Sequence, residues 1–230
     1  ERAANVGWMA KEIKKELEEL TGCPCVIGND DNVAALGEMW KGAGEGEKDL
    51  IMVTLGTGVG GGIIINGEIA PSHRGVGGEL GHITVNPDEE ATCNCGNHGC
   101  LEQYASATGI SRLARKKMEH EARATILTKE DLSAKAVFDA VKEGDEVAIE
   151  VATEMGNYLG HAMADMAAVL DPAVFVIGGG VSKAGEVLLS FIEKPFMEKA
   201  FFANKNVKFK LATLGNDAGI CGAAKLVLED

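Results

Sequence analysis

The sequence predicts a mixed α/β fold, because segments with the pattern of strands alternate with segments with the pattern of helices. Short runs rich in β-branched residues at 50–55, 63–65 and 174–177 have the composition of buried strands. Around them, apolar residues recur every three or four positions, as in amphipathic helices. An apolar content of 46% and a charged content of 25% over 230 residues are ordinary for a globular protein of one large or two small domains.

The first forty residues predict two helices separated by a strand. Apolar side chains repeat at helical spacing over 13–20, and the run ends at a Gly-x-Pro sequence. Residues 25–27 have the composition of a short buried strand. We expect Asp31 or Asn32 to cap a second helix that continues to about Trp40.

The remaining elements are predicted from the periodicity of apolar residues and from the positions of Gly and Pro. The stretch 71–100 is rich in Gly, Pro and Cys and predicts a long irregular loop, which is usually functional inside a compact domain. In the helix predicted over 145–170, a long methionine-containing stripe is interpreted as core packing. We also expect a glycine turn at 56–62, helices at roughly 105–119 and 133–142, a strand around 209–211 and a final helix over 217–227.

Three cysteines and a nearby histidine form the most specific motif of the chain. Cys93, Cys95 and Cys100 are close in sequence, and both His82 and His98 are near them. Zinc binds four nitrogen or sulfur ligands in a tetrahedron, and this set supplies that number. Glycines between the thiols permit the tight turns that bring three sulfurs to one point. The motif therefore predicts a zinc site that holds nearby carboxylates in place.

The residues alone leave two points open at this motif. Three close thiols also permit one disulfide with a thiol left over, or three inert buried thiols. We expect a cytoplasmic protein, since no signal peptide or long apolar run is present, and stable disulfides are rare in that compartment. Spacing does not choose between His82, which lies beside Glu79, and His98, which lies inside the loop.

Glycine clusters mark two candidate nucleotide contacts. Gly56, Gly58 and Gly61 match G-x-G-x-x-G, but the isoleucines at 63–65 predict a strand where a dinucleotide-binding motif requires a helix. The alternatives are a hairpin whose N–H groups and Thr57 hydroxyl surround phosphates, which the number of glycines favours, or a plain tight hairpin.

The strand predicted at 174–177 runs into three glycines, at the edge where α/β sheets bind ligands. A nucleotide contact and an ordinary strand-to-helix turn are equally compatible with it.

A run of four polar residues at 29–32 stands between a predicted strand and a predicted helix. An aspartate at such a junction can act as a general base toward a hydroxyl, although a plain helix cap is the usual role. Asp31 suits the cap, whereas Asp30 suits a cleft.

Together these segments resemble the ROK family of sugar kinases and repressors. The stretch Cys93–Gly109 is most similar to the bacterial members that phosphorylate glucose. The matching segments occur in family order along the chain and lie at 29–38, 55–62, 78–82, 93–102 and 176–181.

The resemblance implies a role for each matched residue. Asp30 would take the proton from the sugar 6-hydroxyl. Other sugar hydroxyls would be bound by Asn29, Glu79, His82 and Glu102. A structural zinc would be held by His82, Cys93, Cys95 and Cys100, which decides against His98. ATP phosphates would contact Thr57 and Gly58, and adenosine would lie near Gly179.

The implied fold is the two-lobed sugar kinase/actin/heat-shock ATPase-like (ribonuclease H-like) fold, here mainly its C-terminal lobe with a zinc-binding loop. We expect residues 1–30 to be the end of the N-terminal lobe, 31–215 the C-terminal lobe, and 216–230 a terminal helix that packs back toward the first lobe. Family members begin with a hairpin that carries Asp-x-Gly-x-Thr. This sequence lacks that motif, so the chain is expected to be a fragment or to have its true start upstream.

The implied activity is ATP-dependent phosphorylation of the 6-hydroxyl of a hexose, with glucose the first expectation and N-acetylmannosamine, fructose or allose the alternatives. A non-catalytic, sugar-responsive repressor lobe is the rival from another class. A formal charge of −13 argues against a nucleic-acid surface. No segment approaches the roughly 18 apolar residues that span a bilayer. The expected cofactors are ATP, Mg²⁺ and structural Zn²⁺, and the expected state is a cytoplasmic homodimer that acts in glycolysis.

Overall fold

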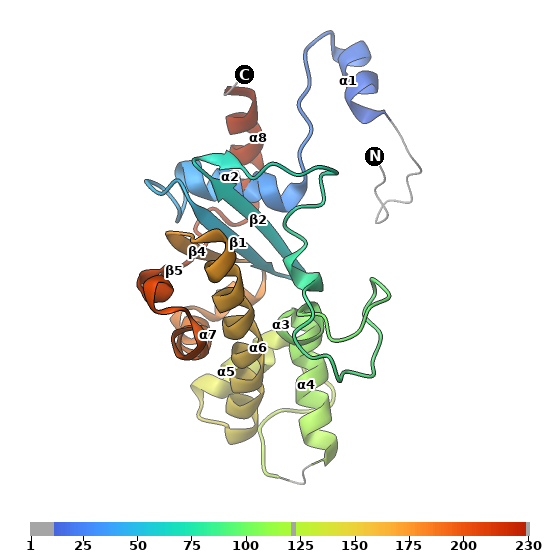
Figure 1. The fold of residues 1–230 in the computed structure, drawn as a ribbon. Coiled ribbons are helices and arrows are strands. Elements are labelled where there is room, and N and C mark those ends of the chain that lie inside the picture. Colours follow the sequence, from blue (N-terminus) through green and yellow to red (C-terminus); the bar gives the residue numbers. More distant parts are fainter. Residues whose placement is uncertain (1–11, 121–122, 229–230) are drawn as a thin grey trace.

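The computed structural model describes residues 12–120 and 123–228. A five-stranded sheet with the order β3-β2-β1-β4-β5 lies at its centre (Figure 1). Its strands are β1 (Leu50–Leu55), β2 (Val59–Ile65), β3 (Glu68–Ile69), β4 (Val174–Gly178) and β5 (Lys208–Leu211). β1 pairs antiparallel with β2 and parallel with β4, which in turn pairs parallel with β5. The carboxyl ends of β1, β4 and β5 therefore meet at one edge, where such sheets bind ligands.

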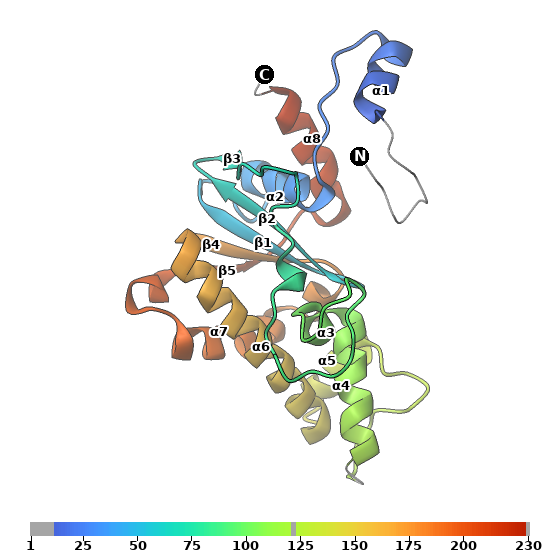
Figure 2. The same cartoon turned by 45° about the vertical axis from the view of Figure 1, so that its right-hand side comes forward.

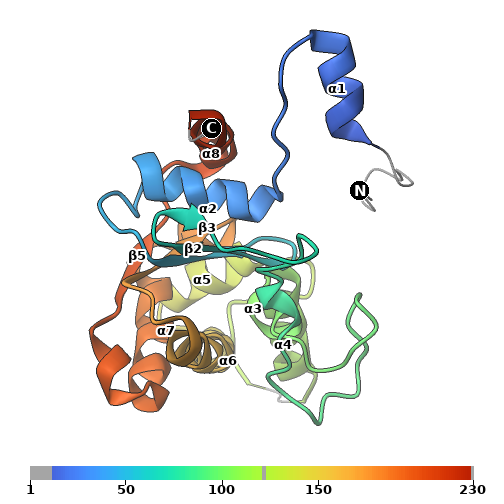
Figure 3. The same ribbon diagram turned by 45° about the horizontal axis from the view of Figure 1, so that its top comes forward.

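Helices cover both faces of the sheet (Figure 3). One face carries α2 (Asp30–Lys41) and α8 (Ala218–Leu228). These two helices approach closely, because a Cβ at Gly37 or Gly222 would overlap the backbone of the other helix. The other side carries α5 (Ala134–Lys142), α6 (Glu146–Leu170) and α7 (Glu186–Lys199), with the short α3 (Glu102–Ala105) and α4 (Ala107–His120) beside them.

The larger core lies between the sheet and α6. Met155, Met163 and Met166 are at most 5% exposed, so the predicted methionine stripe is core. Aromatic rings continue this core under the outer strands: the centroid of Phe196 lies 4.9 Å from that of Phe209 and 5.9 Å from that of Phe175. These contacts hold α7 against β4 and β5.

The predictions for β1, β4, α5 and α6 are confirmed to within a residue or two. The glycine turn is shorter than expected, because Gly60, Gly61 and Gly62 lie in β2. A Cβ at Gly61 would overlap Leu80, and one at Gly62 would overlap Ala35 and the Asp31 backbone. Two of these glycines therefore permit close packing and do not form a turn.

Two expectations about local structure are wrong, and one helix was not predicted. The strand expected at 25–27 is absent, and Val26 and Ile27 are 44% and 37% exposed. Neither Asp31 nor Asn32 caps α2, since the cap is Asn29. The helix α7 was not predicted, and it contains an internal proline, Pro195, that breaks the usual pattern.

The helix α1 (Ile13–Thr21) lies apart from the sheet and is joined to α2 by an extended segment (Figure 2). None of its residues is buried, and its Leu20 is 82% exposed. The amphipathic pattern therefore predicted this helix correctly, but no residue of the helix is buried. No described helix is long and apolar enough to cross a membrane.

Candidate active site

The start of α2 places two neighbouring carboxylates, those of Asp30 and Asp31, in environments that differ in exposure to solvent. The Asn29 side-chain oxygen accepts hydrogen bonds from the backbone N–H and the side-chain amide of Asn32, at 3.1 and 3.2 Å. Asp30, the first helical residue, is exposed. Asp31 is half-buried with its carboxylate against the backbone of Gly60. Burial, and then the charge of Asp30, raise the pKa of Asp31.

Asn32 is a buried residue that sequence reasoning used only as a possible cap. Its amide donates to the Gly77 carbonyl at 3.1 Å, and its oxygen accepts from the Ile63 N–H at 3.3 Å. One side chain thus ties α2 to β2 and to the loop that leads to Glu79. Its partners lie 31 and 45 residues away, so no local pattern signals this role.

A cleft of about 470 Å³ opens at the carboxyl ends of the strands. Its lining includes Asp30, Asp31, Thr54, Gly179 and Lys183. Gly179 has a φ of +82°, and a Cβ there would overlap the backbone of Leu55, so glycine is required.

A cavity of about 320 Å³ lies beyond this cleft, and its walls include Gly180, Val181, Lys183, Phe138 and Ala134. Both hollows share Gly180 and Lys183, so a ligand extended along the triple glycine could enter both.

The turn between β1 and β2 is the predicted glycine hairpin. Its Gly56 carbonyl accepts from the Ala107 N–H at 2.8 Å, and its Thr57 carbonyl accepts from the Thr108 hydroxyl at 2.8 Å. The hairpin is thereby anchored to the start of α4, while Thr57 itself is exposed. A Cβ at Gly58 would overlap the carboxylate of Glu102.

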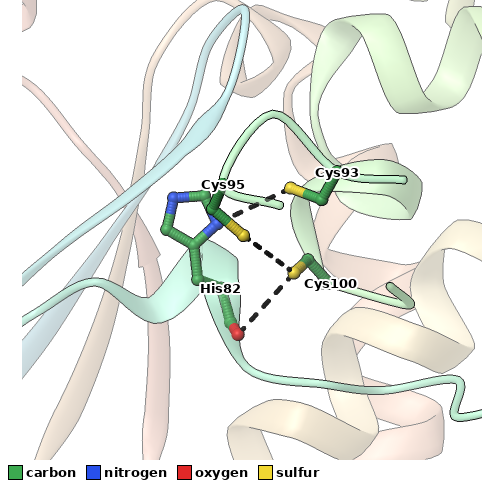
Figure 4. A group of neighbouring side chains, drawn as sticks. All are labelled: His82, Cys93, Cys95 and Cys100. Atoms are coloured by element: carbon green, nitrogen blue, oxygen red, sulfur yellow. Dashed lines mark hydrogen bonds between the residues drawn. The ribbon is translucent and has the colours of Figure 1, made fainter. Parts of the chain in front are cut away.

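His82, Cys93, Cys95 and Cys100 converge, with their potential ligand atoms all within 4.8 Å of one another (Figure 4). The Cys93 sulfur lies 3.8 Å from His82 Nδ1, and the Cys95 and Cys100 sulfurs lie 3.6 Å apart. One imidazole and three thiols are the donor set of a closed structural zinc site. His98 is exposed, and its ring nitrogen lies 3.1 Å from the Glu90 carbonyl, outside this group.

The thiols differ in environment. Burial, and then a hydrogen bond with Cys95, raise the pKa of Cys100 to about 12. A backbone hydrogen bond from Asn97 is the main cause of a lowered pKa at Cys95.

The two predicted sugar-binding glutamates flank the cluster. Glu79 Oε2 lies 4.0 Å from His82 Nε2. Glu102 Oε1 lies 4.0 Å from the Cys93 sulfur, and its other oxygen accepts from the Val59 N–H at 3.1 Å. The charge of Glu79 also contributes to the raised pKa of Asp31. The structure therefore brings the cysteine loop, the glycine hairpin and the start of α2 to one region.

Glu38 is a second residue that sequence reasoning missed. It is 0% exposed, and its carboxylate accepts from the backbone N–H groups of Ala43, Thr213 and Leu214 at 2.8–3.2 Å. It fixes the loop after β5, whose residues Thr213 and Gly215 line the 470 Å³ cleft.

The comparisons with known proteins agree with this arrangement. The profile described as "ROK family" matches residues 2–230, so the chain belongs to the ROK family. It is 48% identical to a glucokinase of Halalkalibacterium halodurans, over 99% of this chain and 70% of that protein. A crystal structure of a ROK glucokinase from Streptomyces griseus in complex with glucose and AMPPNP superposes with a TM-score of 0.84 at 36% identity, over 100% of this chain and 76% of that chain.

A more distant relative is the xylose repressor of Caldicellulosiruptor bescii, which is 28% identical over 99% of this chain and 58% of the repressor. Because a solved ROK glucokinase and a solved ROK hexokinase share the fold, the architecture is that of the sugar kinase/actin-like proteins, as the resemblance implied.

Proposed function

We propose that this protein phosphorylates the 6-hydroxyl of a hexose with ATP, and that glucose is the hexose. The observation that carries the proposal is the meeting of three groups in one region: the exposed Asp30, the glutamates beside the cysteine loop, and the glycine hairpin. The named glucokinase relatives, at up to 48% identity over nearly the whole chain, support the choice of substrates.

Phosphoryl transfer depends on positioning and on charge stabilisation, with little covalent work for the protein. In the proposed reaction Asp30 accepts the proton of the sugar 6-hydroxyl while the hydroxyl oxygen attacks the γ-phosphorus of ATP, and ADP leaves. Asn29, Glu79, His82 and Glu102 bind the other hydroxyls. Exposure of Asp30 at the mouth of the cleft leaves room for the sugar beside it.

The nucleotide is proposed to extend along the triple glycine. The backbone N–H groups at Thr57 and Gly58 would contact phosphates, and the adenosine would lie near Gly179. The cavity lined by Val181 and Phe138 offers an apolar wall for the base. ATP enters as its Mg²⁺ complex, in which the cation neutralises phosphate charge.

We also propose that His82, Cys93, Cys95 and Cys100 hold one structural zinc. Bound there, zinc would supply rigidity to the loop that carries Glu79 and Glu102. Four protein ligands leave no open position, so water activation is not part of the role. We further propose that the protein acts in the cytoplasm as a homodimer.

The second candidate function, a sugar-responsive repressor lobe, is favoured by relatives that are transcriptional regulators, such as the xylose repressor at 28% identity and the Escherichia coli regulator NagC at 37% identity over 77% of this chain. A hexose panel measured by kcat/KM on the full-length protein in an ATP-coupled assay decides between the two. Glucose should give the highest kcat/KM. Sugar binding by calorimetry without ATP consumption on any hexose would contradict the kinase proposal and favour the sensor.

A further inference from the structure

Beside the cysteine loop lies a partly buried charged network of residues outside the matched segments 78–82 and 93–102. Glu89, between His82 and Cys93 in sequence, has a side chain only 7% exposed. Its carboxylate accepts hydrogen bonds from the Tyr104 hydroxyl at 2.7 Å, from Arg112 at 2.9 Å and from the Ala91 N–H at 3.1 Å. Burial alone would raise the pKa of Glu89, but these donors outweigh it and lower the pKa to about 2. Glu89 is therefore an ionised anchor in a partly buried position, with the exposed Lys116 3.8 Å from its carboxylate.

Arg112 connects this anchor to α3. While one of its guanidinium nitrogens binds Glu89, its Nε and Nη2 both donate to the Gln103 carbonyl, at 3.2 and 3.0 Å. The guanidinium also lies 5.1 Å from the centre of the Tyr104 ring. A planar, forked cation is suited to such simultaneous contacts, whereas a lysine is not.

Gln103 links the network to the two arms of the cysteine loop. Its amide nitrogen donates to the Ala91 carbonyl at 2.8 Å, two residues before Cys93. Its amide oxygen accepts from the Cys100 N–H at 3.0 Å. One side chain therefore fixes the distance between the segment that carries Cys93 and the segment that carries Cys100.

We propose that Glu89, Gln103 and Arg112 are positioning residues that hold the loop in its metal-binding shape. The inference rests on the zinc site of the proposed function. The four ligands come from three separate stretches of chain, and the stretch 83–99 forms no helix or strand. Without an anchor, ordering such a loop around a cation costs conformational entropy. Groups that orient metal ligands commonly change metal affinity by about 10–100-fold when removed.

Zinc release into an excess of a chromophoric chelator tests this directly. Gln103→Met removes both amide contacts at similar size and should release zinc at least about tenfold faster than the parent. Gln103→Glu keeps an acceptor for the Cys100 N–H but loses the donor to the Ala91 carbonyl, so it should recover only part of the retention. Arg115→Met is the control, because Arg115 is an exposed cation on the same helix as Arg112, and its release rate should equal that of the parent.

Hexose kinetics provide the second measurement. Looser Glu79 and Glu102 should raise the hexose KM of Gln103→Met by about tenfold, whereas kcat should change less than about threefold because Asp30 lies on α2. Glu89→Gln, which keeps the shape of the anchor, should move both measurements in the same direction.

Equal zinc release from the parent and both variants, Gln103→Met and Glu89→Gln, would overturn the inference. A parent that holds no zinc would instead contradict the metal site of the proposed function, which separates the two failures. Should Glu89→Gln fail to fold, the comparison of Gln103→Met with Gln103→Glu still decides. Equal release from that pair would show that the Cys100 contact does not position the ligand.

Discussion

Replacement of Glu38 by glutamine should destabilise the protein strongly, although the two side chains have nearly the same shape. In the structure each carboxylate oxygen accepts at least two N–H donors, drawn from Ala43, Thr213 and Leu214. A glutamine keeps one oxygen and turns an NH₂ group toward the remaining donors. The Thr213 N–H is shared by both oxygens and keeps one of them, so one donor, Ala43 or Leu214, loses its hydrogen bond to a charged acceptor, which costs roughly 1.5–3 kcal/mol. Urea unfolding at neutral pH measures this difference directly.

The same variant should also affect the nucleotide site, because Thr213 lines the 470 Å³ cleft. We expect the KM for ATP to rise with less change in the KM for hexose. Glu45→Gln is the matched control, since Glu45 is exposed in the turn after α2, and its stability should lie within about 0.5 kcal/mol of the parent. A Glu38→Gln protein that unfolds at the parent's urea midpoint would refute the reasoning that this buried carboxylate organises the loop.

Three further predictions follow from the site. Asp30→Asn should keep hexose affinity by calorimetry but lower kcat by about 10²–10⁴-fold, and a near-parent kcat would reject Asp30 as the base. His82→Ala should lose zinc and hexose affinity together in native mass spectrometry and calorimetry, while His98→Ala should lose neither; the reverse pattern would exchange their roles. Because the pKa of Glu89 falls from an unfolded value of about 4.5 to about 2, its stabilisation is present above pH 4.5 and is lost as the pH falls toward 2. This contribution is roughly 3 kcal/mol, so Glu89→Gln should flatten the loss of urea stability between about pH 5 and pH 2, and an unchanged slope would contradict the assignment.

The parts of this structure that local chemistry dictates could be predicted from the sequence. Three thiols and an imidazole at short spacing have few other joint uses, and Cys93, Cys95 and Cys100 do converge with His82. The strand 174–177 is entirely apolar, and the methionines of α6 form one apolar stripe, so both are expected to be buried in the core. In these cases the local pattern and the tertiary environment demand the same arrangement.

The predictions failed where distant partners decide the local structure. Residues 25–27 have the composition of a strand, but in the part of the chain that the structure describes no strand pairs with them. The cap of α2 was misplaced by two or three residues because Asn29, Asp31 and Asn32 are all good capping residues. No local pattern marks Glu38 as buried, because its donors at Thr213 and Leu214 lie about 175 positions away.

Glu102 shows how closely the two halves of the site are joined. One oxygen of its carboxylate approaches the Cys93 sulfur, and the other holds the Val59 N–H at the end of the glycine hairpin. The space it occupies is available only because residue 58 is glycine. If the Glu102 carboxylate moves toward a sugar hydroxyl, its hydrogen bond with the Val59 N–H of the glycine hairpin must change as well. If the proposed roles hold, hexose and nucleotide binding must therefore be coupled, and linkage requires each ligand to change the affinity of the other by the same factor.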